Sequence, residues 1–197
     1  GRLALVSGRA LADLAGHLGE LAVCRAGSHG ASRYLADGTR LGEEPRGLAD
    51  SSIAELKSYA EDHGLFYEEK AHGGALHFRD QPGKRDATLA FAADFAGSRD
   101  LCVTSGKGVI ELVRPCATKA AAVEAFMEIA PFAGATPVFI GDDVTDEHVF
   151  ALGRDDLLTV RVGAEQDSAA GYFIPDHEAI VELLDLLIDC LPGSRRL

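Results

Sequence analysis

Two adjacent aspartates, Asp142 and Asp143, follow an apolar segment (137–141) with the length and composition of a buried strand. Open α/β sheets bind their ligands at the carboxyl ends of such strands. Because neighbouring carboxylates repel each other unless a cation lies between them, we expect a metal ion at this point. Mg²⁺, a hard ion that prefers oxygen ligands, is the first choice, with Asp142, Asp143 and Asp146 as candidate ligands.

A purely structural role competes for part of this acidic cluster. Thr145 can cap a helix expected near residues 146–152, and Asp146 and Glu147 in its first turn suit the positive end of the helix dipole. Capping accounts for Glu147 and competes with metal binding for Asp146, but it does not explain Asp142 and Asp143. An EF-hand is a poor match, because the required Gly and terminal Glu are missing.

Lys119 and Ser7 are candidates for contacts to an anion. Thr118 is the expected N-cap of a helix over 119–129, which puts the Lys119 cation in the first turn at a cost of about 0.3–1 kcal/mol. An anion shared by the helix end and the ammonium would offset that cost, and a solvated surface lysine is the alternative. Ser7 ends an apolar segment (2–7) and can donate to a phosphate oxygen or cap the next helix.

Charged residues of both signs alternate with apolar ones in the middle of the chain. If these segments are strands, one face carries Glu68 with Lys70, His77 with Arg79, and Lys107 with Glu111. The opposite face would carry Tyr67, Leu76, Phe78, Ile110 and Leu112. The charged face suits a polyhydroxylated ligand with an anionic group, which needs donors and acceptors, although an ordinary solvated face would look similar.

These residues require two kinds of architecture to position them. Residues 1–41 and 115–197 alternate buried strands with helices, which predicts an α/β core with a Rossmann-like, doubly wound parallel sheet. The intervening residues 42–114 show helix-strand-strand twice, which predicts an inserted α+β cap with an antiparallel sheet. We expect a turn at Gly73-Gly74 between the first two cap strands and a hairpin turn at Asp37-Gly38.

Composition narrows the possible partners. The chain is 47% hydrophobic and 25% charged, as in ordinary globular proteins, and its net charge of −12 argues against nucleic acid as a partner. No apolar run approaches the roughly 20 residues of a membrane span, and we find no secretion leader, so we expect no membrane partner. The cysteines, at 24, 102, 116 and 190, form no CxxC pair, which fits scattered buried thiols of a reducing cytoplasm better than a zinc site.

The order of the motifs resembles a known superfamily. The sequence Val6-Ser-Gly-Arg9, a lysine at a helix start and then Gly-Asp-Asp is similar to motifs two, three and four of haloacid dehalogenase phosphatases. Residues 139–147, Phe-Ile-Gly-Asp-Asp-Val-Thr-Asp-Glu, resemble trehalose-6-phosphate phosphatases in particular. Further similar segments lie at 26–30, 68–70, 76–79 and 106–111.

The resemblance implies a function and assigns roles to residues. It implies metal-dependent hydrolysis of trehalose 6-phosphate through an aspartyl-phosphate, with Mg²⁺ as cofactor and a phosphosugar as the small-molecule substrate. Ser7, Lys119 and Asp143 would be catalytic, and the metal would lie on Asp142, Asp143 and Asp146. The substrate would be bound by Arg9, His29, Glu68, Lys70, Arg79, Lys107 and Glu111.

The sequence also departs from that pattern. The family's first motif, Asp-x-Asp-x-Thr, supplies the nucleophile and the general acid and base, and the 197 residues contain no Asp-x-Asp. Ala120 stands where the family usually has Gly. We therefore expect these residues alone to be inactive, with a core that lacks its first strand and has a raw sheet edge. The alternatives are a non-catalytic phosphosugar-binding module and a phosphatase for another phosphosugar.

Overall fold

The computed structural model describes residues 2–190 except residues 20, 45, 116 and 164–166. It divides into two compact units, 1–133 and 134–197. The mixture of parallel and antiparallel sheets with helices confirms the expected α/β class with an additional α+β module. The expected division into 1–41 with 115–197 and 42–114 stays a prediction. No helix in the described part of the chain is long and apolar enough to cross a membrane.

The first sheet of unit 1 contains three short strands. They are β1 (Ala4–Val6), β2 (Cys24–Gly27) and β3 (Ser32–Tyr34), in the order β1-β2-β3. Helix α1 (Leu11–Leu18) joins β1 to β2, which pair in parallel, whereas β3 pairs antiparallel to β2. The 3₁₀ turn Ser28–Gly30 between them is too short for the crossover that a parallel pair requires. Helix α4 (Lys119–Met127) completes this part of the unit.

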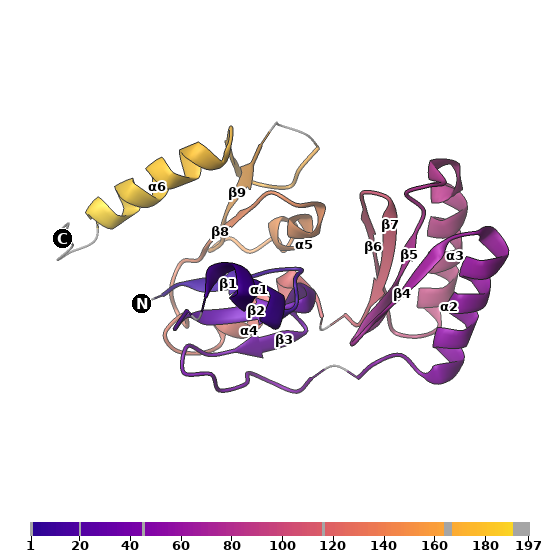
Figure 1. Cartoon of the computed structure of the whole chain (residues 1–197). Coiled ribbons are helices and arrows are strands. Elements are labelled where there is room, and N and C mark those ends of the chain that lie inside the picture. The colour runs from indigo at the N-terminus through magenta and orange to yellow at the C-terminus, as the bar shows by residue number, and fades with distance from the viewer. Residues whose placement is uncertain (1, 20, 45, 116, 164–166, 191–197) are drawn as a thin grey trace. The chain divides into compact units, whose positions relative to one another are not determined.

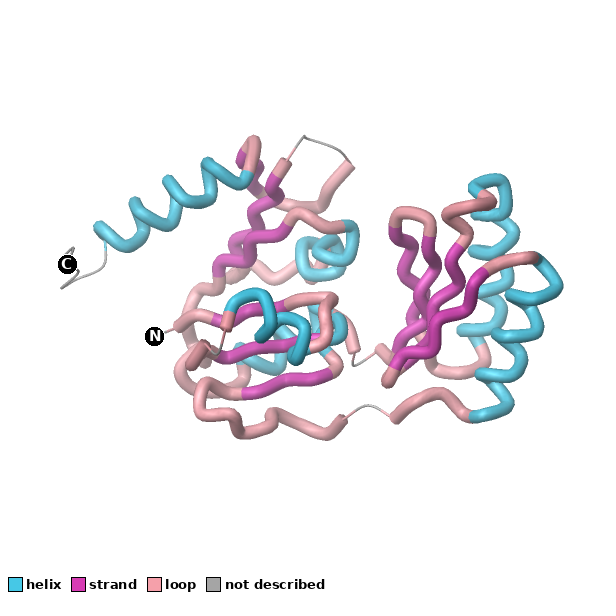
Figure 2. The backbone as a smooth tube through the Cα atoms, in the orientation of Figure 1, coloured by secondary structure: helices cyan, strands magenta, loops and turns pink. Residues whose placement is uncertain are grey.

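The second sheet of unit 1 is the expected antiparallel module. It consists of α2 (Asp50–His63), β4 (Phe66–Lys70), β5 (Gly73–His77), a 3₁₀ turn (Pro82–Lys84), α3 (Arg85–Gly97), β6 (Cys102–Gly106) and β7 (Val109–Val113). The strand order is β4-β5-β7-β6, and both helices lie on one face of the sheet (Figures 1 and 2). The residues expected on that face, Tyr67, Leu76, Phe78, Ile110 and Leu112, all belong to the resulting apolar core.

Gly73 and Gly74 do not form the predicted turn. Gly73 and Gly74 lie within β5, and the turn falls on the two residues before them. A Cβ at Gly74 would lie 2.7 Å from the ring of Tyr67, and one at Gly73 would lie 2.1 Å from the carbonyl oxygen of Leu112. Without side chains, these glycines allow the neighbouring strands and the Tyr67 ring to approach β5 closely. By contrast, the Asp37-Gly38 turn is confirmed, because Leu35 N–H donates to the Thr39 carbonyl at 2.8 Å.

Unit 2 contains a three-stranded parallel sheet in the order β10-β9-β8. Its strands are β8 (Val138–Gly141), β9 (Leu158–Val162) and β10 (Tyr172–Ile174), the last of which was not predicted. A 3₁₀ turn (Val144–Asp146) and α5 (Glu147–Phe150) follow β8, and α6 (His177–Cys190) follows β10. Helix α5 is shorter than the expected 146–152, because the 3₁₀ turn takes Asp146 and the helix ends at Phe150, with Ala151 as its C-cap.

Candidate active site

Three loops that are far apart in sequence meet in unit 1. The first follows β1 at Ser7, the second is the 27–30 turn after β2, and the third is the start of α4. His29 N–H donates to the Ser7 carbonyl at 3.0 Å, and Ser28 N–H donates to the Arg9 carbonyl at 2.7 Å. Gly30 adopts φ 109°, and a Cβ there would lie 2.1 Å from the carbonyl oxygen of Thr118. Only glycine permits this approach of the second loop to the third.

Lys119 is buried at the start of α4. Thr118 is the N-cap as predicted, since its side chain accepts a hydrogen bond from Ala121 N–H at 3.1 Å. The Lys119 residue is only 6% exposed, so the solvated-surface alternative is wrong. A cation held out of water beside the positive end of a helix is an arrangement that an anion would stabilise.

Ser7 and Arg9 lie on the first of these loops. The Ser7 hydroxyl accepts a hydrogen bond from Arg9 N–H at 3.1 Å. Ala10 is the N-cap of α1, so Ser7 does not cap that helix, and its hydroxyl proton can be donated elsewhere. The Arg9 guanidinium donates to the Asp13 carboxylate at 2.8 Å, and this hydrogen bond lowers the pKa of Asp13. Arg9 therefore pairs with Asp13, in addition to the substrate-binding role predicted for it.

His29 connects these loops to the charged side of the antiparallel sheet. It adopts φ 58°, and a Cβ on Gly8 would lie 2.7 Å from its ring, so a residue without a side chain is needed there. Its Nε2 lies 3.2 Å from the Glu111 carboxylate, whose other oxygen accepts from the Lys70 ammonium. Three of the predicted substrate residues are thus in one chain of contacts.

A cavity of about 380 Å³ lies at this junction within unit 1. Its lining includes Gly8, Arg9, Ser28, His29, Glu68, Glu69, Lys70 and His72. The lining carries cationic, anionic and neutral polar groups, as recognition of a charged and hydroxylated ligand requires. The pKa of Tyr67, on the helix side of the same sheet, is raised by burial and by the charge of Glu69.

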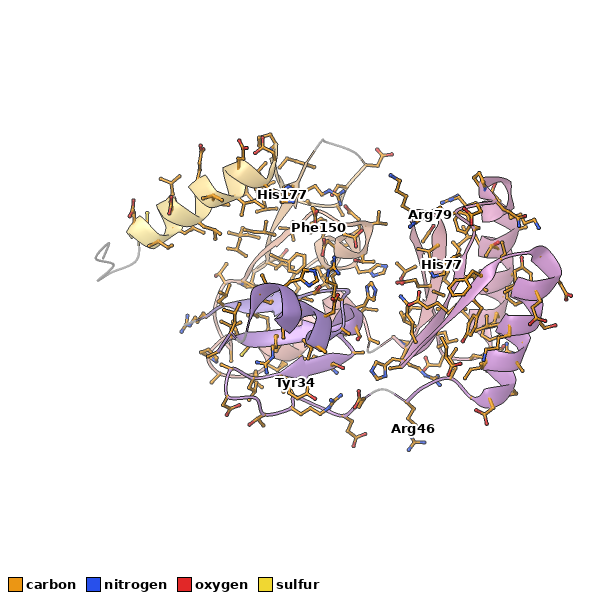
Figure 3. The ribbon with its side chains drawn as sticks, viewed as in Figure 1. Tyr34, Arg46, His77, Arg79, Phe150 and His177 are labelled. Atoms are coloured by element: carbon orange, nitrogen blue, oxygen red, sulfur yellow. The ribbon has the colours of Figure 1, made fainter. Side chains whose placement is uncertain are left out.

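Arg79 and Lys107 do not line that cavity. The cavity lies at the end of the sheet where Lys70 pairs with Gly73, whereas Lys107 is in the turn between β6 and β7 at the opposite end. Arg79 is near that turn, because a Cβ on Gly108 would lie 3.1 Å from the Arg79 Cβ. Figure 3 labels Arg79 and His77 at this end of the module, and His77 Nε2 lies 2.8 Å from the Glu68 carboxylate.

The acidic cluster lies in unit 2 and is organised by a capping box. The Asp143 carboxylate accepts from Val144 N–H at 2.7 Å and from the Thr145 hydroxyl at 3.0 Å, while Asp143 N–H donates to Asp146 at 2.9 Å. Thr145 does not cap α5 as predicted, because it lies inside the 3₁₀ turn, whose N-cap is Asp143, and the N-cap of α5 is Asp146, which makes no side-chain capping bond. Asp146 is buried in the box, and its metal-ligand role stays a prediction.

Asp142 differs from its neighbours because its carboxylate is open. Its side chain is 60% exposed, and His177 Nε2 lies 3.5 Å from Oδ2. Among the described residues no group of three His, Cys, Asp or Glu side chains could hold a metal ion. One open carboxylate beside a hydrogen-bonded one still fits Mg²⁺, which is commonly bound through one or two carboxylates plus waters and phosphate oxygens. Ser7 and Lys119 belong to unit 1, and their joint role with the adjacent aspartates in catalysis stays a prediction.

Two histidines with no predicted role have partners beside the candidate site residues. His72 is buried, lines the cavity and lies 3.3 Å from the Glu44 carboxylate. His177 begins α6 beside Asp142. No spacing pattern in the sequence connects either pair, so only the fold could reveal them. Cys116 lies outside the described residues, and Cys24, Cys102 and Cys190 are free thiols, of which Cys24 is buried as expected, Cys102 is partly buried and Cys190 is exposed.

Comparison with known proteins identifies one family. A family model described as trehalose-phosphatase matches residues 1–176. The chain is 34% identical over 190 residues to the trehalose-6-phosphate phosphatase of Escherichia coli, a match covering 93% of this chain and 71% of that protein. It is 35% identical over 163 residues to the trehalose-phosphate phosphatase of Mycolicibacterium paratuberculosis, which covers 77% of this chain and 41% of the relative.

Solved structures show the same fold. The C-terminal domain of the C. albicans trehalose-6-phosphate phosphatase superposes with a TM-score of 0.72 at 19% identity, over 93% of this chain and 77% of that one. A haloacid dehalogenase-like hydrolase from B. subtilis gives a TM-score of 0.69 at 13% identity, over 93% and 87%. At identities this low, the structural likeness supports the fold alone, and this fold agrees with the expected haloacid dehalogenase architecture.

Proposed function

Because this chain belongs to the trehalose-phosphatase family, we propose that it forms the phosphate-holding, metal-binding and sugar-binding part of an enzyme that hydrolyses trehalose 6-phosphate to trehalose and phosphate. The observation that carries the proposal is the buried Lys119 at the start of α4, against the loops of Ser7 and His29.

The phosphoryl group would be held by Ser7 and Lys119. The hydroxyl of Ser7 would donate to one phosphate oxygen, and the Lys119 ammonium and the N-terminus of α4 would neutralise another. These groups bind and orient the phosphoryl group, and none of them is assigned the attack on phosphorus. Their contribution is electrostatic, which is the larger part of catalysis in phosphoryl transfer.

The open carboxylate of Asp142 would be the principal protein ligand of Mg²⁺. Asp143 would support it by fixing the loop through its capping bonds, and Asp146 would complete that box. When bound, the metal would supply charge neutralisation and orientation of the phosphoryl oxygens. Asp142 is suited to this role because its carboxylate is exposed while that of Asp143 already accepts two hydrogen bonds.

The charged face of the antiparallel module would recognise the sugar. Glu68, Lys70 and Glu111 lie in or beside the cavity and offer acceptors and donors for hydroxyl groups. His29 would support Glu111, whose carboxylate it contacts. Arg79 and Lys107 are exposed at the other end of the sheet and would contact a more distant part of the ligand.

The central test measures phosphate release by the full-length protein. We expect Mg²⁺-dependent release from trehalose 6-phosphate, and a loss of about a hundredfold or more in kcat/KM for Lys119→Ala. Lys57→Ala is the matched control, because Lys57 is an exposed lysine paired with Glu69 on the module surface and should leave turnover close to wild type. Binding of trehalose 6-phosphate without turnover would favour a non-catalytic module, and absence of both would defeat the proposal.

A second test separates sugar recognition from phosphate chemistry. Glu111→Gln keeps the shape of the side chain but removes the charge that contacts Lys70 and His29. We expect it to weaken turnover of trehalose 6-phosphate about tenfold or more while leaving that of an aryl phosphate nearly unchanged. Equal losses for both substrates would contradict the sugar-binding role.

A further inference from the structure

One arginine of unit 2 reaches the loop that carries the adjacent aspartates. Arg161 lies in β9 directly beside Gly141, the last residue of β8. Its Nη1 donates to the carbonyl oxygen of Asp143 at 3.0 Å and lies 3.2 Å from Oε1 of Glu147. The Arg161 side chain is only 12% exposed, so these contacts are made largely out of water. One cation therefore holds the backbone of the Asp142–Asp143 loop and the first residue of α5.

Glu147 extends this connection to a third segment. Its Oε2 accepts a hydrogen bond from Ala169 N–H at 2.9 Å, on the segment that leads to β10. Sequence reasoning explained Glu147 by its place in the first turn of a helix, but both of its carboxylate oxygens have partners elsewhere. With the side chain 27% exposed, this is a partly buried, charge-assisted bridge, which is stronger than an exposed ion pair.

The bridge completes the restraint of Asp143. Its N–H donates to Asp146, its carboxylate accepts two hydrogen bonds, and its carbonyl accepts from Asp146 N–H at 3.1 Å as well as from Arg161. Fixing the N–H and the carbonyl of one residue fixes the peptide planes on both of its sides. The plane before Asp143, which joins it to Asp142, is held by the bond from Asp143 N–H to Asp146, and the plane after it is held by the bond from Arg161, so these bonds together restrain the backbone next to the exposed Asp142 carboxylate.

We propose that Arg161 and Glu147 are positioning residues that hold the Asp142–Asp143 loop in its metal-binding conformation. The proposal rests on the proposed function, since it concerns the same Mg²⁺ site. Arginine suits the role because its planar, permanently charged head can serve a carbonyl and a carboxylate together, whereas a lysine offers a single mobile point charge. An ion pair that only stabilised the fold would contribute to the free energy of unfolding and would not change the affinity for the metal.

The test measures metal affinity directly on the full-length protein. Binding of Mn²⁺, followed by electron paramagnetic resonance, and of Mg²⁺, followed by calorimetry, is compared for wild type, Arg161→Met and Glu147→Gln. We expect either substitution to weaken metal binding about tenfold, the size typical of groups that orient metal ligands. Saturating Mg²⁺ should restore much of kcat, while KM for the phosphosugar stays within about twofold of wild type.

Arg154→Met is the matched control. It removes another arginine of unit 2 that is paired with a carboxylate, Asp156, at 2.8 Å and 2.9 Å. We expect unchanged metal affinity in this variant. If wild type binds metal and Glu147→Gln and Arg161→Met bind it equally well, the positioning role is overturned while the proposed function stands. If wild type binds no metal, both are overturned, and if Arg161→Met does not fold, Glu147→Gln decides.

Discussion

Helices α2 and α3 of the antiparallel module differ from α1 and α6 in what they bury. Helix α2 buries Leu56 and Ala60, and α3 buries four residues, among them Phe95, against one face of a four-stranded sheet. Residues 11–18 of α1 and 177–190 of α6 include no buried residue. Yet α6 has a strongly amphipathic sequence, with leucine or isoleucine at six of its positions.

This difference shows that an amphipathic pattern does not by itself make a core. Each pair of neighbours in the module sheet is matched over five residues, so the sheet offers a broad apolar surface to both helices. The β1-β2-β3 and β8-β9-β10 sheets are paired over only three or four residues. A narrow sheet can cover fewer helices, so α4 buries five residues while α1 buries none, and the free energy of burial scales with the apolar area covered.

The largest expected effect comes from truncating one leucine in each region. Leu112 is 0% exposed in the module core, so Leu112→Ala should lower the free energy of unfolding by about 2–5 kcal/mol. Leu187 on α6 is 45% exposed, so Leu187→Ala should change it by less than about 0.5 kcal/mol. Denaturant unfolding of both variants measures the contrast. Similar losses would show that α6 is buried in solution.

Two glycines provide a second comparison. Gly74→Ala in β5 would place a Cβ 2.7 Å from the Tyr67 ring, and we expect a loss of about 1–3 kcal/mol from overpacking. Gly16→Ala in α1 meets nothing within 4 Å and should stabilise the helix by about 0.5–1 kcal/mol. Thermal unfolding midpoints should therefore move in opposite directions. A stable Gly74→Ala variant would mean that Tyr67 can move at little cost.

Helix caps provide a third, smaller comparison. Thr118→Ala removes the side-chain acceptor at the start of α4 and should cost about 1 kcal/mol. Ala49 is the N-cap of α2 and makes no side-chain capping bond, so Ala49→Ser should gain up to about 1 kcal/mol. Chemical denaturation should show a lower free energy of unfolding for Thr118→Ala and a higher one for Ala49→Ser. A loss in the second variant would mean that serine disturbs the approach to α2.

The smallest effect concerns the exposed pair of Arg9 and Asp13. The hydrogen bond from Arg9 lowers the pKa of Asp13, so its stabilising contribution is present above the ordinary carboxyl pKa and is lost as the pH falls through the lowered value. Arg9→Ala should raise the pKa of Asp13 towards that of an ordinary aspartate, measured by NMR titration. An unchanged titration would show that the pair does not persist in solution.

Sequence reasoning succeeded where one local pattern was sufficient. The Thr118 cap, the Asp37-Gly38 turn and the alternating face of the module follow from contacts between near neighbours, and the structure confirms them. It failed at Gly73-Gly74, because a glycine pair required by close packing across a sheet is indistinguishable in sequence from a turn. It also considered Thr145 as the cap of α5, but a 3₁₀ turn capped by Asp143 precedes that helix and contains Thr145.

The amino-acid sequence alone determined the family, the order of the motifs and the residue types available for chemistry, because these depend only on identity and spacing. The tertiary structure alone decided which of those residues have partners. Lys119 is buried, His29 contacts the Glu111 carboxylate, and Arg161 donates a hydrogen bond to the Asp143 carbonyl. Contacts between residues separated by twenty or eighty positions depend on how strands pair and loops cross, and no local preference encodes them.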